Sequence, residues 1–387
     1  MTLTVLTDST INFDQVSFLS EPAIAYGKAG LTVTVNANIL VDATVDNAIF
    51  SDQSGSILIN NGTIFSGGPN GGVDFVSTGG SITNNAGATI AANSTGIFVN
   101  ASSTSVTNHG ALIAYAGTGV DFANGLTALT LTNDGSIFGH SFGIDSFATG
   151  DVINNSGTIR SDGVGIRVVS LASFGNTVID NARGGLIHGS SSAIDASTAN
   201  AAISLNNRGI IDGQIKFSFN TAADDFIRNS GKIRGDVQLG LGNDTFNGRG
   251  GTSGAVFGGA GNDTIVGGNK HDILIGNSGL DHLKGSGGSD SFKFVALNDS
   301  AVGVTRDVIV DFSHTQHDKI DLQGIDANSG AANDQAFHFI GAKGFHGVAG
   351  ELRYAHHILQ GDVDGNGAAD FEIHVNIASL AKGDFIL

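Results

Sequence analysis

Aspartate recurs every nine residues in the segment 258–293, which reads GGAGNDTIV GGNKHDILI GNSGLDHLK GSGGSDSFK when divided into nines. Each block begins with glycine, has aspartate at its sixth position and carries a large apolar residue at its eighth. Carboxylates, together with carbonyl oxygens exposed at glycine turns, are the hard ligands that Ca²⁺ takes at roughly 2.3–2.6 Å. The pattern therefore predicts a calcium-binding segment.

The nine-residue spacing also predicts how these carboxylates are arranged. One block supplies a tight turn and a short strand, so two blocks form one coil and the turns of alternate blocks stack. Asp263 then lies over Asp281 on one edge, and Asp272 lies over Asp290 on the opposite edge. Because stacked strands are about 4.8 Å apart, such carboxylates repel each other unless a cation lies between them. Asp244 precedes Asp263 by the length of two blocks and one inserted residue, so it is expected on the same edge.

The predicted calcium ligands are the aspartates and the turn glycines of these blocks. They are Asp244, Gly258, Gly259, Gly261, Asp263, Gly267, Gly268, Asp272, Gly276, Gly279, Asp281, Gly285, Gly288 and Asp290. The apolar residues at the eighth positions, Ile265, Leu274, Leu283 and Phe292, are expected to point inward and form a thin core. Because so thin a core buries little apolar area, we expect the folding of this segment to depend on the metal.

Tandem copies of G-G-x-G-x-D-x-U-x, in which U is a large apolar residue, resemble the RTX (hemolysin-type calcium-binding) nonapeptide repeat. The resemblance implies a parallel β-roll over residues 236–293 with Ca²⁺ as its cofactor. It also implies a secreted, extracellular protein.

The C-terminal residues extend the resemblance to a second family. The matching stretches are NDS (298–300), DVIVDFSHTQHDKIDLQGIDA (307–327), AFHFIG (336–341), AGELRY (349–354), GDVDGNGAADFEI (361–373) and DFIL (384–387). Together with the nonapeptides they make residues 239–387 similar to the C-terminal domain of serralysin-type secreted metalloproteases. This resemblance implies a β-rich domain over 294–387 that carries an uncleaved signal for a type I (ABC transporter) secretion machinery. The N-terminus has no basic region before Lys28, which predicts that there is no cleaved signal peptide.

Two further groups of residues are candidates for calcium. Asp362, Asp364, Asn366, Gly367 and Asp370 follow the EF-hand-like spacing D-x-D-x-N-G-x-x-D. The twelfth position of this run is Ile373 instead of the bidentate glutamate, so a hairpin with a polar turn is the alternative. Asp299, together with Asp307, is a candidate to complete the last site of the roll.

A longer repeat organises the first part of the chain. Asparagine followed by glycine and a β-branched residue or Leu recurs at similar intervals, with the glycines at positions 62, 87, 110, 135, 157, 184, 209 and 231. A repeat of this length cannot bury its apolar face alone, so stacked repeats are expected to form a right-handed parallel β-helix of about eight coils. Asn and Gly are expected at the corners because both tolerate φ > 0. The pattern resembles the β-helical passengers of autotransporters and adhesins over 46–235, and residues 1–45 are expected to form an N-terminal cap or the first strands.

Composition excludes several classes of function. The formal net charge is −18, so neither nucleic acid nor an anionic membrane is an expected partner. The chain has no cysteine, which removes disulfides and thiol catalysis. No apolar run is long enough for a transmembrane helix. The HExxH motif of zinc proteases is also absent, so the serralysin resemblance does not imply proteolysis.

Two functions remain open for the β-helix. A surface of mainly Ser, Thr, Asn, Ala and Gly favours a structural or adhesive module with glycans or a cell surface as partners. The alternative is an RTX-tailed enzyme that acts on polysaccharides. Asp121 and Asp145 recur in a GxD pattern on neighbouring coils and are the candidate acid/base pair. Phe98, Arg167 and Lys216 occupy the same position in other coils, which favours a surface ladder instead.

Overall fold

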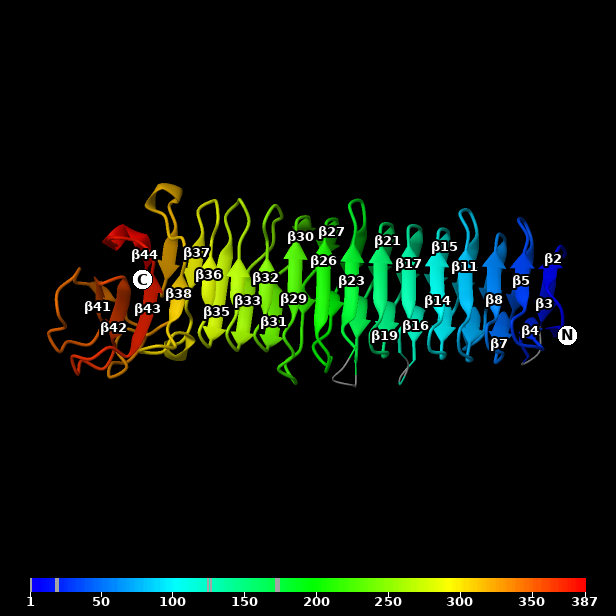
Figure 1. Cartoon of the computed structure of the whole chain (residues 1–387), viewed down its shortest axis with the longest axis horizontal. Coiled ribbons are helices and arrows are strands. Elements are labelled where there is room, and N and C mark those ends of the chain that lie inside the picture. The colour runs from blue at the N-terminus through cyan, green and yellow to red at the C-terminus, as the bar shows by residue number, and fades with distance from the viewer. Residues whose placement is uncertain (1, 18–20, 124, 126, 171–174) are drawn as a thin grey trace. The chain divides into compact units, whose positions relative to one another are not determined.

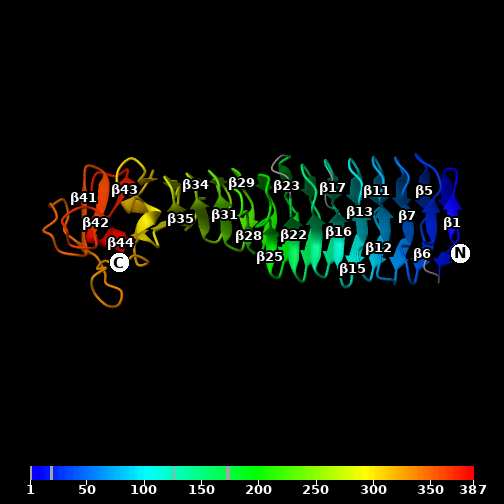
Figure 2. The same ribbon diagram turned by 90° about the horizontal axis from the view of Figure 1, so that it is seen from below.

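The computed structural model describes residues 2–17, 21–123, 125, 127–170 and 175–387 (Figures 1 and 2). The chain divides into two compact units, Met1–Phe217 and Ser218–Leu387. In the described residues both units are built from β-strands, and the second also has three short 3₁₀ helices. The chain holds about 13 turns of parallel β-solenoid. The predicted fold class is thereby confirmed. No helix among the described residues is long and apolar enough to cross a membrane.

Each coil of the first unit contributes one strand to each of three parallel sheets, which we call A, B and C. Sheet A contains β1 (Leu3–Val5), β4 (Ile24–Tyr26), β7 (Ile49–Ser51), β10 (Val73–Phe75), β13 (Ile97–Val99), β16 (Thr118–Phe122), β19 (Phe142–Ser146), β22 (Val164–Val168), β25 (Ser192–Asp195) and β28 (Ile215–Lys216). Sheet B contains β2 (Ser9–Ile11), β5 (Thr32–Val35), β8 (Ile57–Asn60), β11 (Ser81–Asn84), β14 (Ser105–Asn108), β17 (Thr130–Asn133), β20 (Val152–Asn155), β23 (Thr177–Asn181) and β26 (Ile203–Asn207). Sheet C contains β3 (Gln15–Ser17), β6 (Leu40–Ala43), β9 (Thr63–Ser66), β12 (Thr89–Ala92), β15 (Ala111–Ala114), β18 (Ser136–Gly139), β21 (Thr158–Ser161), β24 (Leu186–Gly189) and β27 (Ile210–Asp212).

The strands are short because every coil must turn three corners. Their side chains alternate between the interior and the solvent, as the period of two requires. Equivalent residues of successive coils pair in register, so that Ile82 lies beside Val106 and Val106 beside Leu131. These columns of buried β-branched residues and Leu form the core. The described strands before residue 46 follow the same path and belong to the first coils.

The asparagines of the long repeat are interior residues. Seven of them end successive strands of sheet B and are at most 1% exposed: Asn60, Asn84, Asn108, Asn133, Asn155, Asn181 and Asn207. The Nδ2 of each donates to the Oδ1 of the next at 2.7–2.8 Å. We call this row the asparagine ladder. The interpretation that Asn is needed for φ > 0 is wrong, because none of the seven has a positive φ.

Most glycines of this repeat are needed for the close approach of successive coils and not for a positive φ. Among them only Gly87 and Gly184 have a positive φ, +82° and +91°. A Cβ at Gly110, Gly135 or Gly157 would lie less than 3.0 Å from a backbone oxygen of the preceding coil. Glycine therefore allows the coils to approach each other at this corner.

The second unit begins with a roll whose coils have two strands. One sheet contains β31 (Val237–Leu241), β33 (Val256–Ala260), β35 (Ile273–Ser278), β37 (Ser291–Lys293), β39 (Lys319–Asp321) and β44 (Phe385–Ile386). The facing sheet contains β29 (Phe226–Asn229), β32 (Thr245–Asn247), β34 (Thr264–Val266), β36 (His282–Lys284) and β38 (Asp307–Ile309). The short strand β30 (Lys232–Ile233) lies between β29 and β31, so this first coil has three strands and the following coils have two. Thr264 pairs with His282, and Leu274 pairs with Phe292. The two residues of each pair are separated by two nonapeptides in the sequence, so one coil contains two nonapeptides. The four predicted core residues, Ile265, Leu274, Leu283 and Phe292, are fully buried.

A β-rich cap completes this unit. It contains η1 (Leu297–Asp299), η2 (His314–Gln316), β40 (His338–Phe339), β41 (Glu351–Ala355), β42 (Ile358–Asp362), β43 (Phe371–Val375) and η3 (Lys382–Asp384). β41, β42 and β43 pair antiparallel, and β43 joins the roll by pairing parallel with β38. β44 pairs with β39, so the C-terminal strand is part of the folded sheet.

Candidate calcium sites

The aspartates of alternate nonapeptides stack along the first edge of the roll. The backbone N–H of Asp244 donates to Oδ1 of Asp263 at 2.8 Å, and that of Asp263 donates to Oδ1 of Asp281 at 2.7 Å. The N–H of Asp281 continues the series to Oδ1 of Asp307 at 2.9 Å. Each aspartate therefore satisfies the backbone of the coil before it with one carboxylate oxygen.

The opposite edge has the same arrangement. The N–H of Asp272 donates to Oδ1 of Asp290 at 2.9 Å, and the N–H of Asp290 donates to Oδ1 of Asp318 at 2.9 Å. The stacking of Asp263 on Asp281 and of Asp272 on Asp290, inferred from the spacing, is therefore present.

The second carboxylate oxygen of most of these aspartates is buried without a hydrogen-bond partner. This is true of Oδ2 of Asp244, Asp263, Asp281, Asp290 and Asp307, each at most 1% exposed as a residue. Burying an ionised oxygen without a partner is costly, and buried carboxylates are normally paired or bound to a metal. The donor set thus fits a hard cation such as Ca²⁺. Asp272 differs, since its Oδ2 accepts the N–H of Gly268 at 2.7 Å.

The first glycine of each nonapeptide keeps the space beside this oxygen free of side-chain atoms. A Cβ at Gly258, Gly267, Gly276 or Gly285 would lie less than 3.0 Å from Oδ2 of the aspartate in the same repeat. At Gly258 and Gly267 it would also lie 2.6 Å from a glycine carbonyl oxygen of the next coil. Carboxylate and carbonyl oxygens therefore meet at one point, as a calcium site requires.

The later glycines shape the turn. Gly259, Gly261, Gly279 and Gly288 have φ of +112°, +131°, +145° and +126°, a region that L-residues rarely adopt. At the second position of two repeats Asn277 and Ser286 replace glycine, with φ of 65° and 70°. These two residues remain in the left-handed region, so the turn keeps its direction.

Burial raises the pKa of these carboxyls. The pKa of Asp263, Asp281 and Asp290 is raised to about 7, first by desolvation and further by neighbouring aspartates, against the lowering effect of the backbone N–H bonds. The pKa of Asp244 is likewise raised to about 7. Asp307 is affected most, because desolvation and Asp281 raise its pKa to about 9. Protons therefore compete with a cation for the roll near neutral pH.

Metal-free protein should accordingly be most stable in mildly acidic solution. A carboxyl whose folded pKa is near 7 and whose unfolded pKa is near 4 takes up a proton on folding between these values. Its stabilising contribution is present at low pH and is lost as the pH rises through about 7. We expect the roll, freed of metal on a chelating resin, to keep more β structure by circular dichroism at pH 5 than at pH 8, where it should be unfolded. With Ca²⁺ present the roll should instead be more stable at pH 8 than at pH 5, because metal binding requires deprotonated ligands. If the calcium-loaded roll is still more stable at pH 5, the assignment of these carboxylates as calcium ligands is contradicted.

The structure adds two aspartates that the sequence reasoning missed. Asp225 is 3% exposed and donates its N–H to Oδ1 of Asp244 at 2.7 Å, and Asp318 accepts the N–H of Asp290. Both lie outside the glycine-rich blocks. The signal that could have found them is aspartate followed two positions later by isoleucine, at Ile227 and Ile320.

The carboxylate of Asp299, a further candidate calcium ligand, accepts hydrogen bonds from its own loop. Oδ2 of Asp299 accepts the N–H groups of Val295 and Ala296, and this carboxylate lies close enough to raise the pKa of Asp281 and Asp307. Asp299 therefore lies near Asp281 and Asp307 of the first edge, and its role as a calcium ligand stays a prediction.

In the β42–β43 turn, ligand oxygens of Asp362, Asp364 and Asp370 lie within 4.8 Å of one another. Asp362 accepts the N–H groups of Gly365 and Gly367 through its two oxygens, and Asp370 accepts that of Val363. Asn366 donates its N–H to Asp364 at 2.9 Å. These bonds are those of a polar hairpin turn, and the buried Ile373 belongs to β43.

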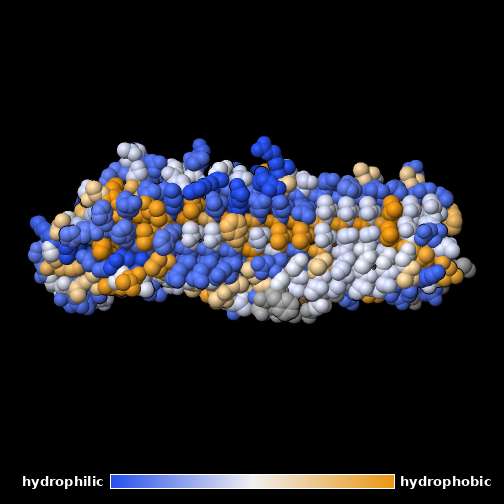
Figure 3. All heavy atoms as spheres, viewed as in Figure 1, coloured by the Kyte–Doolittle hydropathy of each residue, from blue (hydrophilic) through white to orange (hydrophobic). Residues whose placement is uncertain are grey.

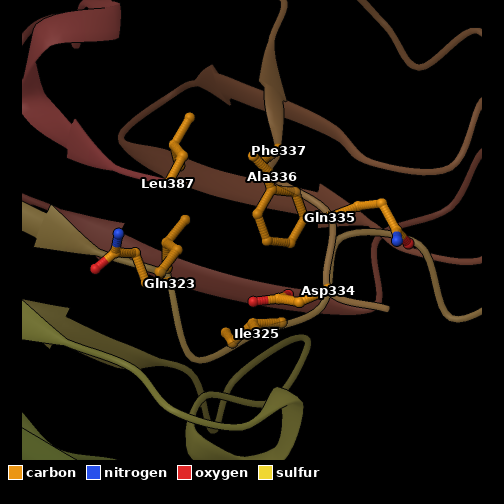
Figure 4. A pocket seen from close by; sticks show the side chains of 8 residues that line it. Gln323, Ile325, Asp334, Gln335, Ala336, Phe337 and Leu387 are labelled. Atoms are coloured by element: carbon orange, nitrogen blue, oxygen red, sulfur yellow. The ribbon is translucent and has the colours of Figure 1, made fainter. Parts of the chain in front are cut away.

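A cavity of about 170 Å³ in the second unit is separate from these sites (Figure 4). It is lined by Leu322, Gln323, Ile325, Asp334, Gln335, Ala336, Phe337 and Leu387. Figure 4 shows Leu387 and the ring of Phe337 at the cavity, with the Gln335 side chain directed away from them. None of the sequence-predicted site residues lines it.

The candidate catalytic pair lies on the outer face of sheet A. Asp121 pairs with Asp145 on the next coil, and Asp145 pairs with Arg167 on the one after. Arg167 donates Nε–H to Oδ1 of Asp145 at 2.8 Å and a second N–H to Oδ2, and its guanidinium lies 3.9 Å from the centre of the Phe142 ring. Asp145 is 3% exposed. Both of its oxygens are thus engaged by Arg167, whose side chain is 32% exposed. Desolvation and the Asp145 charge raise the pKa of Asp121 to about 7.

Replacing Arg167 should destabilise the first unit. The substitution Arg167→Met leaves the buried Asp145 carboxylate without its partner, which typically costs about 1–3 kcal/mol. Arg160→Met is the matched control, because Arg160 points outward from β21 on the same coil and is exposed. Chemical denaturation followed by circular dichroism measures both; equal effects would show that the Asp145–Arg167 pair contributes nothing specific.

Comparison with known proteins supports the metal assignment. Residues 257–292 match the family model of the RTX calcium-binding nonapeptide repeat in four copies. The chain therefore contains RTX calcium-binding repeats, and they coincide with the stacked turns of the roll. No curated protein matches the sequence.

Proposed function

We propose that this chain is a secreted calcium-binding protein whose roll folds around Ca²⁺ outside the cell and whose β-helix is a non-catalytic structural or adhesive module. The observation that carries the proposal is the row of buried, unpartnered carboxylate oxygens in the RTX roll. Without a cation these oxygens oppose folding, and with one they favour it.

Calcium supplies a switch between the two sides of a membrane. Calcium sites in proteins range from nanomolar affinity in cytosolic buffers to about 10⁻⁴–10⁻³ M in extracellular modules. A roll in the weak range stays unfolded inside the cell and folds when it meets extracellular calcium. An unfolded chain is also the form that a narrow export channel can pass.

The proposed route of export is a type I secretion system. The resemblance of residues 239–387 to serralysin C-terminal domains supports a signal within 294–387. The test is to express the full chain in a bacterial host with and without a type I exporter. We expect the protein in the medium only with the exporter; retention in the cells in both cases would remove this route.

The face of sheet B supports the adhesive role. Over β11, β14 and β17 its outward residues are Ser81, Thr83, Ser105, Thr107, Thr130 and Thr132, which pair in register between coils. This part of the face is pale in Figure 3, the colour of residues that are neither strongly hydrophilic nor strongly hydrophobic. These residues are half-buried, and rows of outward hydroxyl groups suit hydrogen bonding to neutral glycans at a cell surface or in a matrix.

A polysaccharide-active enzyme is the second candidate. It is favoured by the Asp121 carboxyl, whose pKa of about 7 suits a general acid. A screen of alginate, pectate and bacterial exopolysaccharides with the wild type and Asp121→Asn decides between the two. Activity that disappears in Asp121→Asn would replace the non-catalytic proposal, whereas an inactive wild type would support it.

A further inference from the structure

The first coil of the roll departs from the others at one residue beside its aspartate. Leu239 stands at the register position of Gly258, because Gln238 pairs with Phe257 and Gly240 pairs with Gly259. It is fully buried and points inward like Val237, two residues earlier in β31.

The rest of this turn keeps the geometry of the calcium-binding repeats. Gly240 and Gly242 have φ of +109° and +136°, close to the +112° and +131° of Gly259 and Gly261. Asp244 donates its N–H to Oδ1 of Asp263 at 2.8 Å and has a buried, unpartnered Oδ2 like the repeat aspartates. The first position is therefore the feature that separates this turn from the next.

That position is where the repeats have no room for a side chain. A Cβ at Gly258 would lie less than 3.0 Å from Oδ2 of Asp263 and 2.6 Å from the carbonyl oxygen of Gly276. These two oxygens are the ones that would bind an ion. Leu239 has the equivalent register position, so its Cβ takes the place in the coil of Asp244 that Gly258 leaves free beside Asp263.

We infer that Leu239 closes the calcium position beside Asp244, so that on this edge the first ion is held between Asp263 and Asp281. An apolar side chain in this space both fills it and removes the polar surroundings that a divalent cation needs. Asp244 then belongs to the hydrogen-bonded stack without binding metal. The inference rests on the proposed calcium binding by the roll, and it identifies the pair Asp263 and Asp281 as the first that holds an ion on this edge.

Counting the calcium ions bound to the intact chain by native mass spectrometry tests it. Asp244→Asn keeps the acceptor for the N–H of Asp225 and should leave the wild-type number unchanged, whereas Asp263→Asn should lower it. Leu239→Gly should add one ion, and the double variant Leu239→Gly with Asp244→Asn should return to the wild-type number. Val237→Gly creates a similar cavity in the same strand and should add no calcium ion.

The outcomes separate this inference from the function on which it rests. A wild-type chain that binds no calcium removes the proposed function itself. If the wild type binds calcium, loss of an ion in Asp244→Asn, or an unchanged number in folded Leu239→Gly, overturns the role of Leu239. Should Leu239→Gly fail to fold by circular dichroism, the Asp244→Asn count alone decides the question.

Discussion

Removing calcium should unfold the roll and leave the β-helix intact. In hydrogen exchange measured by mass spectrometry, peptides from 240–293 should exchange at the rate of an unfolded chain in calcium-free buffer and be protected in millimolar Ca²⁺. Peptides from 81–160 should be protected in both conditions, because the core there is a continuous column of buried Ile, Leu and Val. At about 10 times Kd, which millimolar Ca²⁺ reaches for a Kd of about 10⁻⁴ M, each bound ion adds about 1.4 kcal/mol. Several ions together therefore supply a large part of the stability of a domain, typically about 5–15 kcal/mol.

One variant of a proposed ligand and two controls make this result specific. Asp281→Asn should raise the calcium concentration needed for protection, because it removes one charge from a fully buried ligand position. Asp224→Asn should not, since Asp224 is exposed and asparagine retains the acceptor for the N–H of Asn243. Mg²⁺ should not replace Ca²⁺, because it demands a smaller octahedral site and dehydrates reluctantly. Protection of 240–293 without any metal at pH 8, above the raised pKa values of the roll carboxyls, would contradict the prediction.

Interrupting the asparagine ladder should have the largest effect in the first unit. Asn155 receives a hydrogen bond from Asn133 and donates to Oδ1 of Asn181 at 2.8 Å and to the carbonyl oxygen of Leu186 at 3.2 Å. Asn155→Leu deprives these groups of a partner, and each buried unsatisfied group costs about 1–3 kcal/mol. On that basis we expect a loss of about 3–5 kcal/mol in the free energy of unfolding, measured by urea denaturation in the presence of Ca²⁺.

The adjacent residue provides the control. Asn154 precedes Asn155 in β20 and points to the opposite, outer face. The same change there, Asn154→Leu, should shift stability by about 0.5 kcal/mol or less. Equal losses from both variants would mean that the hydrogen-bonded ladder is not what stabilises the coil stack.

The sequence predicted the features that depend on local spacing. The nine-residue period led to coils of two nonapeptides and to the stacking of Asp263 on Asp281, because covalent chain length alone determines which turns coincide. The positions of Asn and Gly in the longer repeat predicted stacked coils for the same reason. Their physical role was misread, because a repeated Asn at a strand end serves equally as a turn residue or as an interior ladder, and only burial distinguishes them.

The nine-residue period could not predict which aspartates complete the two edges of the roll at its C-terminal end. Asp307 and Asp318 join the two edges after insertions, so that the steps from Asp281 to Asp307 and from Asp290 to Asp318 are both longer than two nonapeptides. A loop of any length can return to the same edge, so the spacing carries no signal there. The strands that follow these aspartates bring them into register.

By itself the sequence determined that this protein is a β-solenoid with a calcium-binding roll, because period, glycine and aspartate are local and repeated. Only the tertiary structure decided which oxygens lack a partner, which asparagines are interior, and that Arg167 engages the carboxylate of Asp145. It also placed the buried Leu239 at the register position of Gly258. These features depend on which atoms of different coils meet in a dry interior, where each polar group must find a partner across the stack.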